Sequence, residues 1–138
     1  MSTTTHRIGQ IHLVMVPSSD QDRSVAFYKA LGFTTQADAD FGDGQRWIEM
    51  VPPDGKTGVA LVPGRPEAAG TQTGIVVTTG DIDATHAQLL AEGHDVDPAV
   101  ARAGSPAEIR LGGVSLTEPW PPMFYLRDPD GNALLVVG

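Results

Sequence analysis

Cysteine is absent from this sequence of 138 residues. Without it the chain has no disulfide bond, no thiolate metal ligand and no cysteine nucleophile. Long apolar runs are absent as well, and none approaches the roughly 20 residues that a membrane-spanning helix needs. The first residues, MSTTTHRIG, lack the apolar region of an export signal, so we expect a cytoplasmic protein.

Basic residues are few, with nine Lys and Arg against 17 Asp and Glu, which gives a formal net charge of -8. Such a surface repels phosphate backbones and anionic lipids, so we predict neither a nucleic-acid partner nor a membrane partner. An apolar fraction of 41% indicates a folded globular chain. The length suits one domain, residues 1–138.

The first half of the chain has a clear order of elements. The segment IHLVMV predicts a strand, and Ser19 with Asp22 three residues later resembles a capping box before a helix. Gly32 suits the left-handed position after the end of that helix. The segment QRWIEMVPPDGKTGVALVPG then predicts two strands joined by the turn at residues 53–55.

The second half repeats this order. GIVVTT predicts a strand from Gly74, Asp81 is a candidate helix cap and Gly93 a helix stop. Two further strands flank the Pro-Asp-Gly turn at residues 129–131. The repetition predicts an α+β fold of two βαβββ modules, with module one at 7–64 and module two at 73–138. The extra length of module two, residues 97–122, is rich in Gly and Pro and is either a functional lid or a mobile excursion.

Two segments carry a family resemblance. IHLVMVPSSDQDRSVAFYKALGF and FYLRDPDGNALLVV resemble the vicinal oxygen chelate superfamily of glyoxalases, bleomycin-resistance proteins and extradiol dioxygenases. The resemblance implies that the curved sheets of the two modules close around a cavity, and that the protein forms a homodimer. It also implies a divalent metal in that cavity, with one ligand from the first strand and one from the last strand of each module.

The metal positions implied by the resemblance are mostly without donor atoms in this chain. They fall on His12, near Ala60, at about Gly74 and at Leu135, and among these only His12 has a side chain that can bind a metal. A catalytic divalent metal typically holds at least three protein ligands. We therefore predict no metal site and no cofactor, unless the ligands have moved.

His12 has two interpretations. It lines the ligand cavity, or it is a partly buried histidine with a backbone or water partner. Period two places His12 and Val16 on one face of their strand, and Trp47 and Glu49 on one face of another. If both faces look into the cavity, Glu49 comes near His12, and the pair provides a general base oriented by a carboxylate or a reduced metal site. In the other arrangement Glu49 lies on a solvated edge.

Tyr125 is equivalent to Glu49 in the repeated frame, because each lies four residues before the proline of its Pro-Asp-Gly turn. Its hydroxyl either serves a bound ligand as a donor or acid, or lies at the surface. Aromatic side chains are the other candidates for a cavity lining, although each more often packs in a core. They are Trp47, Trp120, Phe124 and Tyr125.

These observations predict a metal-independent protein that binds a small, partly aromatic molecule in its cavity, as the bleomycin-resistance branch does. The predicted ligand-binding residues are His12, Trp47, Glu49, Trp120, Phe124 and Tyr125. The alternative is a lyase, isomerase or cyclase of the glyoxalase type. It would use His12 with Glu49 or Tyr125 as catalytic residues, with or without a divalent metal.

Overall fold

Helices and strands follow one another in the same order in the two halves of the chain, apart from two extra strands in the second half. The computed structural model describes residues 7–67 and 70–138. The first half contains β1 (Leu13–Ser18), α1 (Gln21–Ala30), β2 (Thr34–Gly42), β3 (Gln45–Val51) and β4 (Gly58–Pro63). The second half contains β5 (Gln72–Thr78), α2 (Ile82–Ala91), β6 (Asp95–Val96), β7 (Ile109–Leu111), β8 (Val114–Leu116), β9 (Met123–Arg127) and β10 (Ala133–Val137).

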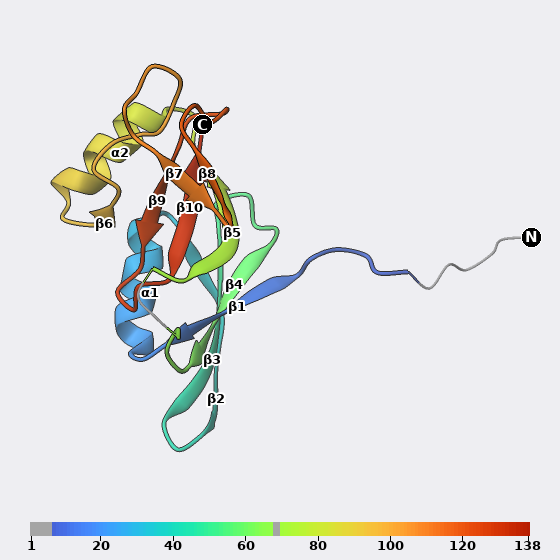
Figure 1. Cartoon of the computed structure of the whole chain (residues 1–138). Helices are drawn as coiled ribbons and strands as arrows, with labels where there is room; N and C mark the ends of the chain where they lie inside the picture. Colours follow the sequence, from blue (N-terminus) through green and yellow to red (C-terminus); the bar gives the residue numbers. More distant parts are fainter. Residues whose placement is uncertain (1–6, 68–69) are drawn as a thin grey trace, which may run out of the picture.

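The strands form two four-stranded sheets of matching topology (Figure 1). Sheet A has the order β1-β4-β3-β2 and sheet B the order β5-β10-β9-β6. In each sheet the first strand pairs with the last in parallel, and the remaining neighbours are antiparallel. This topology confirms the predicted α+β fold of two βαβββ modules.

The helix ends were predicted in part. Asp81 caps α2, and Gly32 and Gly93 follow the two helices with φ values of +97° and +83°. The cap of α1 is Asp20, whose carboxylate accepts from the backbone N–H of Arg23. The predicted capping box of Ser19 with Asp22 is therefore wrong, because Ser19 has a partner elsewhere in the fold.

That partner lies in the second module. The sequence predicted a turn at residues 129–131, and in the structure this turn with its flanking residues also joins the two modules. The Asp130 carboxylate accepts from the backbone N–H of Ser19 at 3.2 Å and from the Ser19 hydroxyl. The Asn132 amide donates to the Pro17 carbonyl at 2.9 Å. These bonds attach the turn of module two to the end of β1 and to the loop that precedes α1.

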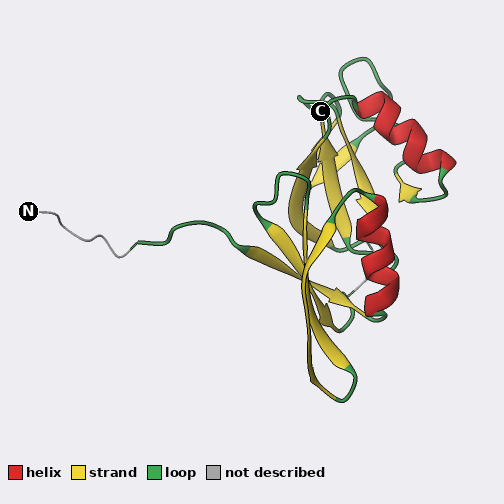
Figure 2. Cartoon of the chain, turned by 180° about the vertical axis from the view of Figure 1, so that it is seen from behind, coloured by secondary structure: helices red, strands yellow, loops and turns green. Residues whose placement is uncertain are grey.

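One face of each sheet packs in a core that the two modules share. Val16, Leu61 and Ile48 are paired across sheet A and are fully buried. Phe124 and Val136, paired across sheet B, belong to the same cluster. Both helices lie on one side of the sheets, and residues 7–12 extend away on the other side (Figure 2). The opposite face of each sheet is consequently left for other contacts.

The segment 97–122 is neither an open excursion nor a simple loop. Its strands β7 and β8 form a hairpin, which packs through Ile109, Leu111 and Leu116 in a second apolar cluster with Leu135 and Tyr125. The hairpin therefore lies against the side of sheet B that faces away from the shared core. Among residues 7–67 and 70–138, no helix is long and apolar enough to cross a membrane.

Candidate functional site

The face of each sheet that points away from the shared core is called here its open face. The open faces of the two sheets carry equivalent rows of side chains. In sheet A, strand pairing aligns Met15 of β1, Ala60 of β4 and Glu49 of β3. In sheet B, the corresponding row is Val76 of β5, Leu135 of β10 and Tyr125 of β9. Glu49 and Tyr125 thus hold matching places in the two modules.

The open face of sheet B holds a pocket of about 250 Å³. Its floor comes from β5 and β10, and its walls from Tyr125 and the tip of the β7–β8 hairpin. The apolar lining residues are Ile75, Val76, Leu111, Ala133 and Leu135. Most small-molecule sites combine such an apolar lining with a few polar groups.

Gly74 lies in a bulge of β5 at the floor of this pocket. Its φ is +79°, and the register between β5 and β10 shifts between Ala133 and Leu135. The Thr73 hydroxyl closes the bulge, since it donates to the Ala133 carbonyl at 2.9 Å and accepts from the Ile75 N–H. A Cβ at Gly74 would meet no atom within 4 Å. The glycine therefore leaves the floor open.

Tyr125 supplies the hydroxyl of the pocket. This hydroxyl donates to the Arg110 carbonyl at 2.7 Å, and the Tyr125 backbone N–H donates to the Asp97 carboxylate at 2.9 Å. Burial, followed by the nearby charge of Asp97, raises the pKa of Tyr125 above its usual range. The phenol is therefore neutral at physiological pH, and its oxygen remains able to accept a hydrogen bond from a ligand.

Trp47 and Glu49 form a pair on the open face of sheet A. The Trp47 indole N–H donates to the Glu49 carboxylate at 2.7 Å, and both side chains are partly buried. The pairing satisfies the indole donor and fixes the direction of the carboxylate. Glu49 therefore lies on the open face and not on an outer edge of the sheet.

The structure does not bring His12 to this pair. His12 precedes β1, is exposed, and accepts through its carbonyl from the Gly58 N–H at 3.2 Å. Strand alternation places its side chain with Val16, on the face opposite to Met15.

The spacing of the repeat also separates His12 from the position equivalent to Gly74. The helix caps Asp20 and Asp81 are 61 residues apart, and the same spacing relates Gly74 to Leu13 and not to His12. The sequence already carried this signal in the equal spacing of Gly32 and Gly93.

Phe124 and Trp120 lie away from the pocket. Phe124 is fully buried in the shared core, where its ring centroid lies 4.9 Å from that of His86. Alternation along β9 directs it to the face opposite to Tyr125. Trp120 is 87% exposed and does not line the pocket. Of the aromatic candidates, Tyr125 therefore lines the pocket on sheet B, and Trp47 lies on the open face of sheet A.

The residues at the family's metal positions do not fit a metal ion. The repeat spacing makes Leu13, and not His12, the equivalent of Gly74, so the positions that the resemblance implies become Leu13, Ala60, Gly74 and Leu135. None of these side chains has a donor atom. Within the described part of the chain, no three His, Asp or Glu residues are grouped so as to hold a metal.

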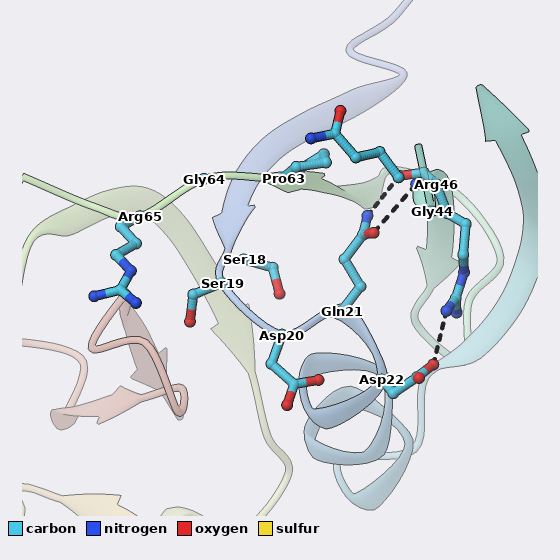
Figure 3. A pocket seen from close by; sticks show the side chains of 11 residues that line it. Ser18, Ser19, Asp20, Gln21, Asp22, Gly44, Arg46, Pro63, Gly64 and Arg65 are labelled. Atoms are coloured by element: carbon cyan, nitrogen blue, oxygen red, sulfur yellow. Dashed lines mark hydrogen bonds and ion pairs between the residues drawn. The ribbon is translucent and has the colours of Figure 1, made fainter. Parts of the chain in front are cut away.

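A second hollow, of about 440 Å³, opens at the N-terminal end of α1 (Figure 3). Its polar groups are largely bonded to one another. The Gln21 amide donates to the Arg46 carbonyl and accepts from the Arg46 N–H, while the Arg46 guanidinium pairs with Asp22 at 2.9 Å. This hollow has both charges and little apolar surface, so the pocket on sheet B is the better candidate site.

Sequence reasoning missed Gln72, Leu111 and Gly112, which also line the pocket. Two of them belong to the β7–β8 hairpin. The sequence IRLGGVSL contained a signal for this hairpin, because Gly-Gly between short apolar runs is typical of a two-residue turn. The position of the hairpin over sheet B had no local signal.

Comparison with known proteins identifies the family. Residues 10–136 match the profile of the Glyoxalase/Bleomycin resistance protein/Dioxygenase superfamily. The chain belongs to this superfamily, which confirms the resemblance found in the sequence. No protein with a curated description matches the chain.

Solved structures support the same assignment over nearly the whole chain. TnmS3, an antibiotic binding protein from Streptomyces sp. CB03234, is 29% identical with a TM-score of 0.70, and the match covers 96% of this chain and 98% of that one. A member of the superfamily from Sphaerobacter thermophilus DSM 20745 is 26% identical with a TM-score of 0.72, covering 94% and 97%. A glyoxalase/bleomycin resistance protein from Streptomyces sp. CB03234 is 29% identical with a TM-score of 0.65, covering 94% and 100%.

Proposed function

We propose that this protein binds a small, partly aromatic molecule in the pocket on sheet B, without a metal ion. The observation that carries the proposal is the apolar pocket with one phenol oxygen, that of Tyr125, free to accept a hydrogen bond. The Tyr125 hydrogen is already donated to the Arg110 carbonyl. A ligand that brings its own hydroxyl or N–H donor therefore fits the pocket best.

Two further observations support binding in preference to turnover. The family's metal positions hold Leu13, Ala60, Gly74 and Leu135, so the metal chemistry of the enzymes has no ligand set here. TnmS3, at 29% identity, is an antibiotic binding protein. A similar role for this chain is the sequestration or carriage of such a molecule in the cytoplasm, with no nucleic-acid or membrane partner.

The pocket also supports a homodimer. Its volume of about 250 Å³ lies slightly below the range of roughly 300–1,000 Å³ common for drug-sized ligands. The open face of sheet A exposes Met15 to 67%, in the same row as Glu49, and so offers apolar surface to cover it. We place this face of a second copy over sheet B, so that the two sheets enclose the ligand together.

The experiment compares 1-naphthol with 1-methylnaphthalene by calorimetry on the unaltered chain and on Tyr125→Phe. Loss of the phenol oxygen is expected to weaken the binding of 1-naphthol by about 2- to 10-fold more than the binding of 1-methylnaphthalene. This factor is the range expected for one hydrogen bond. The substitution also removes the bond to Arg110, but that loss affects both compounds equally. Equal effects on the two compounds would contradict ligand binding at Tyr125.

Metal independence has a separate test. Binding of 1-naphthol is expected to persist after dialysis against a chelator, and zinc or nickel titration is expected to reveal no stoichiometric site. Tight metal that is lost in His12→Ala would overturn this part of the proposal. Conversion of the bound compound to a new product, detected by mass spectrometry, would instead favour the glyoxalase-type alternative.

A further inference from the structure

The β7–β8 hairpin forms one wall of the pocket. Leu111 and Gly112, at the end of β7 and in the turn, line it opposite β5 and β10. Ile109 at the start of the hairpin is 3% exposed and packs in the cluster with Leu135. The shape of the pocket therefore depends on where this hairpin lies.

Gln72, at the start of β5, holds the hairpin with both ends of its amide. Its Nε2 donates to the Arg110 carbonyl at 3.0 Å, and its Oε1 accepts from the Gly112 N–H at 3.0 Å. The Arg110 carbonyl also accepts from the Tyr125 hydroxyl at 2.7 Å. Three hydrogen bonds thus join the turn end of the hairpin to β5 and β9.

The hairpin has little else to fix its turn end. Among the described residues, β7 and β8 pair with each other and with no strand of sheet A or sheet B. An isolated two-stranded hairpin is only marginally stable in water. Its buried apolar anchor, Ile109, lies at the end far from the Gly112–Gly113 turn, whereas Leu111 beside the turn is only partly buried. The Gln72 amide therefore supplies two of the three hydrogen bonds that fix the turn end.

We propose that Gln72 is a positioning residue of the pocket: its amide holds the hairpin against sheet B, and the hairpin retains the bound molecule. This inference rests on the proposed function. The Nε2 donor and the Oε1 acceptor of Gln72 are both engaged by the hairpin, so Gln72 acts on the ligand through Leu111 and Gly112. Release of the hairpin from Gln72 opens the pocket and sets the rate at which the ligand leaves.

The test uses the full chain with Gln72→Glu, which keeps the size of the side chain but places a second oxygen against the Arg110 carbonyl. Amide hydrogen exchange in residues 109–116 is expected to accelerate about 10-fold, and exchange elsewhere is expected to stay unchanged. In stopped-flow measurements, 1-naphthol is expected to dissociate about 3- to 10-fold faster, and its association rate constant is expected to change less. Gln72→Leu, which removes both hydrogen bonds, is expected to show the same pattern.

Gln88→Glu is the matched control, because it introduces the same charge on the exposed side of α2. Unchanged amide hydrogen exchange in the hairpin of both Gln72 variants would overturn the proposal, whatever the dissociation rate of 1-naphthol. Faster exchange without faster release of 1-naphthol would overturn the role in retention. If the unaltered chain does not bind 1-naphthol, the proposed function fails, and the exchange measurement still decides whether Gln72 holds the hairpin.

Discussion

At the scale of single residues, the most constrained groups lie where the turn of module two meets α1. Asp128 is 4% exposed and accepts from the Asn132 amide at 2.8 Å and from the backbone N–H groups of Asp130 and Asn132. The hydroxyl of Tyr28, fully buried on α1, lies 3.5 Å from the same carboxylate. Burial, and then the charge of Asp128, raises the pKa of Tyr28.

Asp128 is expected to make stability depend on pH. Burial is the largest influence and raises the pKa of Asp128, although the hydrogen bonds from Asn132 act in the other direction. Since the folded pKa lies above the unfolded value, the stabilising contribution is complete below the unfolded pKa of about 4 and is lost as the pH rises through the folded pKa. The free energy of unfolding relative to Asp128→Asn is therefore expected to fall as the pH rises above about 4.

Urea unfolding of both proteins at several pH values measures this difference. Asp54→Asn, in the exposed turn of module one, controls for the removal of one carboxyl group. A difference that rises with pH would mean that the hydrogen bonds from Asn132 outweigh burial at Asp128.

At the scale of elements, the sequence predicted most helices and strands from local chemistry. Asp81 caps α2 because a carboxylate at that position satisfies a free N–H of the first turn. Gly32 and Gly93 end the helices because their positive φ values carry no steric cost for glycine. The predicted βαβββ order includes a strand between α1 and β3, but no local pattern located β2, since nearly all of its side chains are exposed and it shows no apolar alternation.

The bulge of β5 is an element whose glycine has a structural purpose. Gly74→Ala is expected to lower the free energy of unfolding by about 1 kcal/mol, because alanine is strained at positive φ. The added methyl group meets open space and not a neighbouring atom, so no clash adds to this cost. Gly74 lines the pocket, so the added methyl group is also expected to weaken the binding of 1-naphthol.

Urea unfolding and calorimetry measure the two effects. Gly80→Ala is the control, since Gly80 also has open space around it but no positive φ. It is expected to change the free energy of unfolding by less than about 0.5 kcal/mol or to raise it slightly. Equal losses in the two variants would contradict strain at Gly74 as the cause.

At the scale of the whole molecule, the open face of sheet A determines the expected assembly. Analytical ultracentrifugation of the unaltered chain is expected to show a dimer. Met15→Asp is expected to weaken that dimer at least about 10-fold, because a carboxylate is costly to bury in an apolar contact. Leu90→Asp, at a residue 47% exposed on α2, is the control and is expected to leave the dimer intact.

A dimer that persists in Met15→Asp would place the contact on another surface. A monomer at all concentrations would contradict the homodimer, and the pocket of a single chain would then be the complete site. The division of the chain into one domain with modules at 7–64 and 73–138 stays a prediction.

Local patterns in the sequence were sufficient for the repeated order of elements, both Pro-Asp-Gly turns, the helix stops and the family. These features depend on dihedral preferences and hydrogen bonds between residues close in the chain. Tyr125 and Glu49 were also found from the sequence, because the repeat aligns them.

Only the tertiary structure determined which side chains contact one another. Strand side chains alternate between two faces, so a shift of one residue moves a side chain to the opposite face, and this shift separates His12 from the row of Met15 and Glu49. The contacts of Asp130 with Ser19 and of Gln72 with Arg110 join residues 111 and 38 positions apart. No local pattern encodes such pairs, because they form only when sheets, turns and hairpin pack together.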